Sequence, residues 1–194
     1  MEKLNGKKIN TSVFISGRGS NLRSLISHFK KKRSPIYINL IISNNPCAKG
    51  LVYAKKSKIN QYIINFKNKK ASEKKLLKKL VDNKIDLICL AGFMKILSGN
   101  FIKKFNKPII NIHPSLLPKY KGLNTHKKVI KNRDKYSGST VHLVTAKLDS
   151  GKIILQKKIK VNKYENEKTL ERRILEVEHK LYPKAIKKFL NSSF

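Results

Sequence analysis

The sequence predicts an α/β fold, with a mostly parallel sheet covered by helices on both faces. Short apolar runs alternate with longer segments in which apolar residues recur at helical spacing, and this alternation is typical of parallel strands joined by crossover helices. Two late apolar runs follow each other without a helical segment between them, which predicts an antiparallel pair late in the chain. The composition, with 40% hydrophobic residues, is that of a globular protein.

The strands are predicted from runs rich in Ile, Val, Leu and Tyr, which favour extended structure. Seven strands are expected, at residues 9–15, 36–42, 62–64, 87–90, 109–112, 141–144 and 153–161. Because the first five alternate with helices, we predict a Rossmann-like sheet that binds ligands at the carboxyl ends of its strands.

The helices are predicted where apolar residues repeat every three or four positions. Five are expected, at residues 21–30, 50–57, 72–81, 124–132 and about 168–190. We predict that Ser72 caps the third helix and that Glu73 lies in its first turn, where a carboxylate suits the positive end of the helix dipole.

The 194 residues are expected to form one domain, because this length buries one core but is short for two. No repeat or Pro- and Gly-rich linker divides the chain. With only Cys47 and Cys89 present, a disulfide framework is not expected. The first ten residues lack an apolar signal core, and no run approaches the roughly 20 apolar residues of a membrane span, so a cytoplasmic location is expected.

The charge balance is strongly basic, with 45 Lys and Arg against 11 Asp and Glu and a net charge of +34. Such a charge can indicate nucleic-acid binding. The basic residues are almost all Lys, spread over nearly every predicted element, and no zinc-finger spacing or aromatic RNA-binding motif occurs. We therefore expect a solvated lysine surface, whose positive field would still attract anionic substrates.

The first predicted strand leads through the segment SGRGSN, residues 16–21, directly into a helix. Small residues let the backbone turn tightly and direct amides at an anion, and the helix start adds partial positive charge. The segment is neither a full dinucleotide fingerprint nor a P-loop. It is either a phosphate cradle or an ordinary glycine-rich turn.

Asn111 and His113 leave the end of the fifth predicted strand, two residues apart and so on the same side of it. Pro114 then directs the chain out of the sheet. An amide can hydrogen-bond a developing oxyanion, and an imidazole can carry protons near neutral pH. The pair therefore indicates acyl transfer, with two polar residues satisfying a turn as the alternative.

Asp149 lies in the probable turn between the last two strands, in the tripeptide Asp-Ser-Gly. Such tripeptides are ordinary in turns. If the fold brings Asp149 to His113, its carboxylate would favour the imidazolium form and fix the ring.

Two further histidines are given structural roles, and Ser115 is not expected to be a nucleophile. His126 and His142 stand at no metal-ligand spacing with Cys or acidic residues. Ser115 is not in a Gly-x-Ser-x-Gly nucleophile elbow. We expect neither a metal site nor a covalent intermediate.

Four segments occur together in order: SGRGSN at 16–21, LAGFMKIL at 90–97, NIHPSLLPKYKG at 111–122 and GSTVHLVTAKLDSGKIILQ at 138–156. With these segments the chain resembles the folate-dependent phosphoribosylglycinamide formyltransferases, from Ile9 to about Pro183. The resemblance implies the formyltransferase fold. It also implies formyl transfer from 10-formyltetrahydrofolate to the amine of glycinamide ribonucleotide, in de novo purine biosynthesis.

The resemblance further implies which residues bind the two substrates. The ribonucleotide phosphate would lie in a cradle formed by Gly19, Ser20 and Asn21, and Glu178 would meet the glycinamide portion unless it is a solvated helix acid. The pteridine end of the folate would lie along Met94, Lys95, Ile96 and Leu97. The part to about residue 105 would bind the phosphate, and the part from 106 to 194 would hold the folate and the catalytic residues.

The resemblance assigns the reaction itself to three residues. Asn111 would contact the folate and hold the formyl oxygen, His113 would be the general acid, and Asp149 would raise the basicity of His113 and help to organise a water. No metal, membrane or specific nucleic acid is implied as a partner, and the protein would be a monomer or a homodimer.

The chain departs from the family pattern at two places. Where the family commonly has a folate-contacting arginine, this chain offers Lys67, Lys69 or Lys70, of which we take Lys69. The loop after Pro118 carries Lys121 where relatives often have proline, and Asn124 where they often have histidine.

Three other functions stay open from the sequence. Methionyl-tRNA formyltransferases share the Asn-x-His-Pro core but usually add a C-terminal domain for tRNA. Formyltetrahydrofolate hydrolases share the core but usually place a regulatory domain before it, whereas here the catalytic fold begins at about residue 9. A basic nucleic-acid-binding module is the alternative from a different class.

Overall fold

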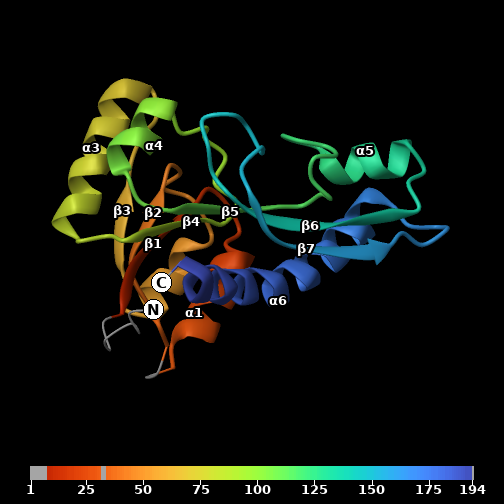
Figure 1. Cartoon of the computed structure of the whole chain (residues 1–194), viewed down its shortest axis with the longest axis horizontal. Coiled ribbons are helices and arrows are strands. Elements are labelled where there is room, and N and C mark those ends of the chain that lie inside the picture. Colours follow the sequence, from red (N-terminus) through yellow and green to blue (C-terminus); the bar gives the residue numbers. More distant parts are fainter. Residues whose placement is uncertain (1–7, 32–33, 194) are drawn as a thin grey trace.

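The predicted strands pair into one seven-stranded sheet, in the order β3-β2-β1-β4-β5-β6-β7. The computed structural model describes residues 8–31 and 34–193 (Figure 1). The strands are β1 Ile9–Ile15, β2 Ile36–Ser43, β3 Asn60–Ile63, β4 Leu87–Leu90, β5 Ile109–His113, β6 Tyr136–Leu143 and β7 Ile153–Lys160. The helices are α1 Ser20–Phe29, α2 Leu51–Lys56, α3 Lys69–Asp82, α4 Gly99–Phe105, α5 Thr125–Lys131 and α6 Glu167–Ser193.

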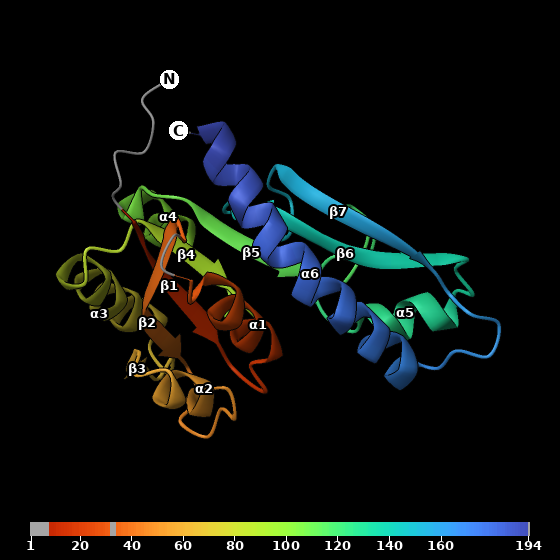
Figure 2. The same ribbon diagram turned by 90° about the horizontal axis from the view of Figure 1, so that it is seen from below.

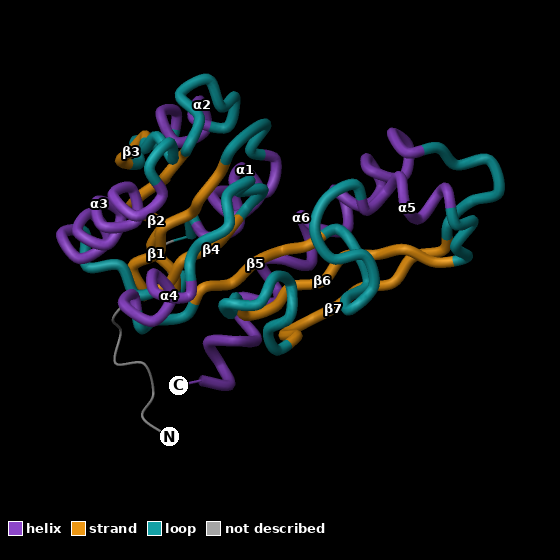
Figure 3. The backbone as a smooth tube through the Cα atoms, turned by 90° about the horizontal axis from the view of Figure 1, so that it is seen from above, coloured by secondary structure: helices purple, strands orange, loops and turns teal. Residues whose placement is uncertain are grey.

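The first five strands run parallel to one another, and β6 reverses direction, so that it is antiparallel to both of its neighbours. β1 pairs in parallel with both β2 and β4, and β4 pairs in parallel with β5. β6 is antiparallel to β5 as well as to β7, and the order across the sheet can be followed in Figure 3. The mostly parallel sheet with a late antiparallel pair is therefore confirmed, and the strand order switches between β1 and β4.

Helices cover both faces of the sheet because the inner strands are apolar on both sides. On β1, Val13 and Ile15 pack against α1, α2 and α6, whereas Phe14 packs on the opposite face against α3 and α4. Figure 2 shows α6 crossing one face beside α1, with α3 and α4 on the far side of the sheet. The expected two-faced cover of the sheet is thus confirmed.

Hydrogen bonds involving polar side chains connect the loops that follow the parallel strands. The amide of Met94, after β4, donates to the Ser16 hydroxyl after β1 over 2.7 Å. The Asn45 side chain, after β2, donates to the Ser16 carbonyl over 3.2 Å. These bonds fix the segments at 16–21 and 90–97 relative to each other at the carboxyl edge of the sheet.

The third helix begins earlier than predicted, so Ser72 is not its cap and Glu73 does not lie in its first turn. Asn68 is the N-cap and accepts from the Ala71 amide, while the Ser72 hydroxyl bonds backward to the Asn65 and Asn68 carbonyls. Glu73 is buried and accepts from both the amide and the hydroxyl of Ser98. Ser98 in turn caps α4, a seven-residue helix that the sequence pattern missed because this tertiary contact begins it.

β6 also begins five residues earlier than predicted, because its first half is polar but buried. Ser137, Ser139 and Thr140 are all buried, so hydrophobic alternation could not reveal them. Gly138 is required there, since a Cβ at this position would lie 2.1 Å from the Lys157 carbonyl oxygen of β7.

Pro183 lies inside α6 without ending it. Proline has no N–H, so the carbonyl of His179, four residues earlier, loses its helical partner. The Ser24 hydroxyl of α1 donates to that carbonyl over 2.8 Å. The proline is tolerated because the neighbouring helix supplies the missing hydrogen bond.

No helix among residues 8–31 and 34–193 is long and apolar enough to cross a membrane.

We predict that Ser24→Ala lowers the free energy of unfolding by about 1 kcal/mol, the usual contribution of such a bond. In a Pro183→Ala background the same change should lower it by much less, because the new N–H at position 183 can donate to His179. Urea denaturation of the four proteins measures both effects, with Ser27→Ala on the exposed side of α1 as control. Equal losses in both backgrounds would contradict this explanation.

Candidate functional site

A cavity of about 710 Å³ opens at the carboxyl edge of the sheet. Its walls come from the segments after β1, β4 and β5, from the turn after β6, and from one side of α6. This is the location expected for a doubly wound sheet, beside the switch in strand order. The residues predicted from separate sequence segments therefore meet in one place.

Asn111 is aligned by the strand beside it. The antiparallel register places Asn111 of β5 opposite His142 of β6. The His142 Nδ1 lies 2.9 Å from the Leu143 carbonyl and donates to it, which leaves Nε2 as an acceptor for the Asn111 amide nitrogen at 3.2 Å. One amide hydrogen of Asn111 is thereby used, and the second remains to bond a ligand oxygen.

His113 is buried, and its ring is held from both sides. Nε2 donates to the Tyr120 carbonyl over 2.8 Å, and Nδ1 faces Asp149 at 3.5 Å, the range of an ion pair once the ring is protonated. Burial lowers the pKa of His113 below its ordinary value, against the raising effects of the Tyr120 carbonyl and Asp149. The ring is therefore neutral at pH 7. Because Nε2 carries the hydrogen bonded to Tyr120, Nδ1 is the nitrogen that can gain or lose a proton.

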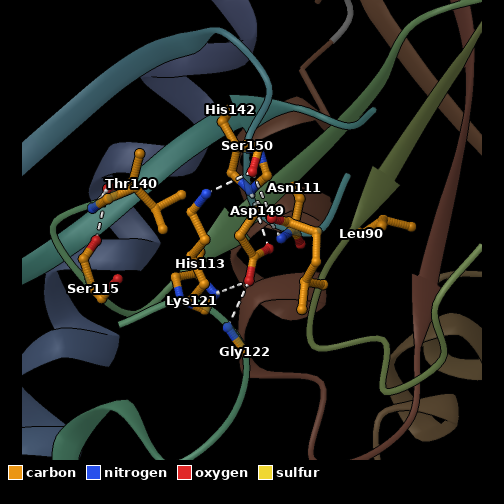
Figure 4. A network of polar contacts seen from close by, with 12 residues as sticks. Leu90, Asn111, His113, Ser115, Lys121, Gly122, Thr140, His142, Asp149 and Ser150 are labelled. Carbon is orange, nitrogen blue, oxygen red and sulfur yellow. Dashed lines mark hydrogen bonds and ion pairs between the residues drawn. The ribbon is translucent and has the colours of Figure 1, made fainter. Parts of the chain in front are cut away.

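Asp149 joins both histidines to the loop that follows β5 (Figure 4). One carboxylate oxygen accepts from the Gly122 amide over 2.9 Å, and the other lies 3.6 Å from His142 Nε2. Burial alone would raise the pKa of Asp149, but His142, the Gly122 amide and His113 together lower it. The carboxylate is thus charged at neutral pH and faces His113.

The loop after Pro118 is held against the Asp149 turn. Lys121, which stands where relatives often have proline, donates to the Ser150 hydroxyl over 2.6 Å. Together with the bond from Gly122 to Asp149, this contact closes the loop onto the site in the structure.

The segment at 16–21 presents the amino end of α1 to the cavity. Gly19 precedes α1 in the left-handed conformation (φ 72°), and no side chain caps the helix, so its first-turn amides are available to an anion. A Cβ on Gly19 would lie 2.5 Å from Gly50 Cα. Replacing Gly19 would therefore disturb the packing of the loop as well as any ligand.

Glu178 is buried in the cavity wall rather than solvated. It accepts from the Asn21 side-chain nitrogen over 2.7 Å, and the Ser139 hydroxyl lies 3.1 Å from its other oxygen. The Asn21 side-chain oxygen is buried without a hydrogen-bond partner in the described structure. An acceptor is thus left for a donor group on a ligand.

The segment after β4 lines the cavity but divides into two kinds of residue. Met94 and Ile96 are about 60% exposed (62% and 61%), whereas Leu97 is 5% exposed and packs in the core with Phe101. Met94, Lys95 and Ile96 can therefore meet a ligand directly. A bulky polar change at Leu97 would damage the core first.

Some sequence predictions do not converge on the cavity. Lys69 and Lys70 begin α3 and Lys67 precedes its cap, and none of the three lines the cavity. The division near residue 105 cuts across the cavity, because Met94 lies before it and Glu178 after it. In the described part of the chain, no group of three or more His, Cys, Asp or Glu side chains is placed to hold a metal ion.

His142 is the site residue that the sequence analysis assigned to a structural role. It contacts both Asn111 and Asp149 and lines the cavity. The sequence offered one signal for His142: it lies two residues after Thr140, on the strand that pairs with the Asn-x-His strand. Only the register of β5 and β6 shows that His142 faces Asn111. His126 also lines the cavity, and its Nδ1 is buried without a partner in the described structure.

We predict that Asp149→Asn lowers the pKa of His113 further, because the carboxylate opposes the effect of burial on the imidazole. Proton NMR titration of the five histidine rings measures this pKa. Asp86→Asn, which removes a surface partner of Lys107, is the matched control and should leave His113 unchanged. A His113 pKa that stays constant or rises in Asp149→Asn would show that Asp149 does not act on this ring.

Comparison with known families matches residues 9–186 to the formyl transferase family. Among curated relatives, phosphoribosylglycinamide formyltransferase of Haemophilus influenzae is 41% identical over 186 residues, 94% of this chain and 87% of that protein. The trifunctional purine biosynthetic protein adenosine-3 of Bos taurus is also 41% identical, over 93% of this chain but 18% of its own length. The chain therefore spans about a fifth of that trifunctional relative.

Solved structures agree in both fold and extent. Phosphoribosylglycinamide formyltransferase of Brucella melitensis superposes with a TM-score of 0.89 at 40% identity, covering 94% of this chain and 96% of that one. Glycinamide ribonucleotide transformylase 1 of Symbiobacterium toebii gives a TM-score of 0.92 at 35% identity, covering 98% and 92%. From the match over residues 9–186 and from these relatives, we conclude that the chain belongs to the formyl transferase family.

Proposed function

We propose that this protein transfers the formyl group of 10-formyltetrahydrofolate to the amine of N1-(5-phospho-D-ribosyl)glycinamide. The products are formylglycinamide ribonucleotide and tetrahydrofolate, in de novo purine biosynthesis. The observation that carries the proposal is the meeting of Asn111, His113 and Asp149 in the cavity wall that also holds the segment at 16–21. The same wall thus carries the three residues proposed for acyl transfer and the loop proposed to bind the phosphate.

Asn111 is proposed to stabilise the charge that develops on the formyl oxygen. The amine nitrogen attacks the formyl carbon, and the electron pair of the carbonyl bond moves to oxygen. The free amide hydrogen of Asn111, held in place by the bond to His142, donates to this oxygen. A donor that is already oriented gives more stabilisation than one that must be ordered during the reaction.

His113 and Asp149 are proposed to move the proton. Attack makes the amine nitrogen positive, and the bond from the formyl carbon to the folate nitrogen breaks only when that nitrogen receives a proton. Nδ1 of His113 can carry it, because Nε2 is bound to Tyr120 and the Asp149 carboxylate stabilises the imidazolium form. The formyl group passes directly between substrates, without an enzyme-bound intermediate.

The substrate ends are proposed to occupy opposite parts of the cavity. The phosphate lies against the amides of Gly19, Ser20 and Asn21, and a donor group of the ribonucleotide bonds the free oxygen of Asn21 beside Glu178. The folate lies along Met94, Lys95 and Ile96. Lys69 is outside the cavity, so it would contact only a part of the folate that projects from it.

The proposal predicts which acceptor receives the formyl group. Labelled 10-formyltetrahydrofolate is incubated with the protein and one of three acceptors: the glycinamide ribonucleotide, initiator methionyl-tRNA, or water alone. We expect label in the ribonucleotide, and neither formylated tRNA nor free formate above the rate without enzyme. Asn111→Ala, which removes the oxyanion donor, is the control for enzyme-dependent transfer.

Two outcomes would redirect the assignment. Formylation of the tRNA in preference to the ribonucleotide would make this a methionyl-tRNA formyltransferase, and formate release without an acceptor would make it a hydrolase. Salt-sensitive binding to random DNA with no folate affinity would favour a nucleic-acid-binding module instead.

A further inference from the structure

A chain of buried polar groups connects Glu178 to the main chain of His113. The Ser139 hydroxyl lies 3.1 Å from a Glu178 carboxyl oxygen and 2.9 Å from the His113 carbonyl oxygen. The other Glu178 oxygen accepts from Asn21 at 2.7 Å. All four residues are buried, Ser139 completely, so these contacts have little competition from water.

The number of protons shared by these polar groups depends on whether Glu178 is protonated or ionised. A serine hydroxyl has one hydrogen, yet Ser139 faces two oxygens that can both accept. Both contacts are hydrogen bonds only if Glu178 is protonated and donates to Ser139, which then donates to His113. If Glu178 is ionised, the hydroxyl donates to the carboxylate, a charge-assisted bond that is stronger than one to a neutral carbonyl.

Glu178 changes its charge near neutral pH. Burial raises its pKa to about 7, with a further rise from Glu171, against the hydrogen bonds from Asn21 and Ser139. The polar and charged groups facing it are Asn21 from α1, Ser139 from β6, and Glu171 and Tyr182 from its own helix. Arg18, on the loop before α1, is paired with Glu171.

We propose that Ser139 is a positioning residue that transmits the charge state of Glu178 to the main chain of His113. When Glu178 is protonated, Ser139 donates to the His113 carbonyl, which also accepts from the Ser115 amide. When Glu178 ionises, the hydroxyl turns to the carboxylate and the carbonyl keeps only its bonds to main-chain amides, from Ser115 and from Thr140 in the β5–β6 ladder.

The consequence is a link between the substrate side of the cavity and the catalytic histidine. A cationic amine near Glu178 favours the carboxylate form, and this form releases one of the bonds that hold His113 at the end of β5. This consequence rests on the proposed function, with the substrate amine as the donor group beside Glu178. The coupling between Glu178 and His113 does not rest on it.

The test uses the carbonyl carbon of His113 as the probe. His113–Pro114 is the one His-Pro bond in the sequence, so labelling histidine with ¹³C at the carbonyl and proline with ¹⁵N selects this carbon alone. Its chemical shift reports the hydrogen bonds that the oxygen accepts. The shift is followed from pH 5 to 9 in the full-length unliganded protein, together with the side-chain carboxyl signal of Glu178.

We expect a step in the carbonyl shift near pH 7 that has the same midpoint as the Glu178 carboxyl. In Glu178→Gln the step should disappear with the shift fixed at its low-pH value, because the amide nitrogen replaces the acid as donor to Ser139. In Ser139→Ala the step should disappear although Glu178 still titrates, and Ser139→Thr, which keeps the hydroxyl, should restore it. Titration of the His113 ring adds a separate step below pH 6.5 in every variant.

A carbonyl shift without a step near pH 7 in the wild-type protein would overturn the proposal. So would a step that persists in Ser139→Ala. Neither readout depends on formyl transfer, so failure of the proposed function is recognised separately, from the acceptor assay.

Discussion

The antiparallel pairing of β6 with β5 is the constraint on which the site depends. It places His142 opposite Asn111 and Thr140 opposite His113, so two strands align the polar groups of the cavity wall. The same reversal returns the chain after β6 toward β5, where Asp149 meets His113 and the Gly122 amide. A fully parallel sheet would have left Asn111 without its partner and Asp149 far from the imidazole.

Several of the few acidic residues of this basic protein line the cavity. Four of the 11 acidic residues line the cavity, namely Asp149, Glu167, Glu171 and Glu178. Each of the two most buried ones has a specific set of donors: the Gly122 amide for Asp149, and Asn21 and Ser139 for Glu178. The lysine surface therefore supplies a long-range positive field that attracts anions, whereas the cavity wall holds a few carboxyl groups with fixed partners.

Apolar periodicity predicted most of the fold, since buried parallel strands and amphipathic helices carry strong patterns. It failed where tertiary contacts replace the pattern, as in the polar first half of β6 and in α4, whose cap Ser98 is bound to Glu73. Asn111, His113 and Asp149 could be selected because their segments carry recognisable chemistry. His142 and Ser139 could not, because their importance comes from register and from contacts between distant residues that a single sequence does not display.

The claim that His113 and Asp149 act as one proton-transfer unit is tested most directly by a double-mutant cycle on kcat for ribonucleotide formylation. His113→Ala should lower kcat by roughly 10²- to 10⁴-fold, the usual range for loss of general acid-base catalysis. Adding Asp149→Asn to His113→Ala should then cost far less than Asp149→Asn costs in the wild-type protein, because the carboxylate acts through the missing ring. Fully multiplicative losses would show that the two residues act independently and would contradict this account.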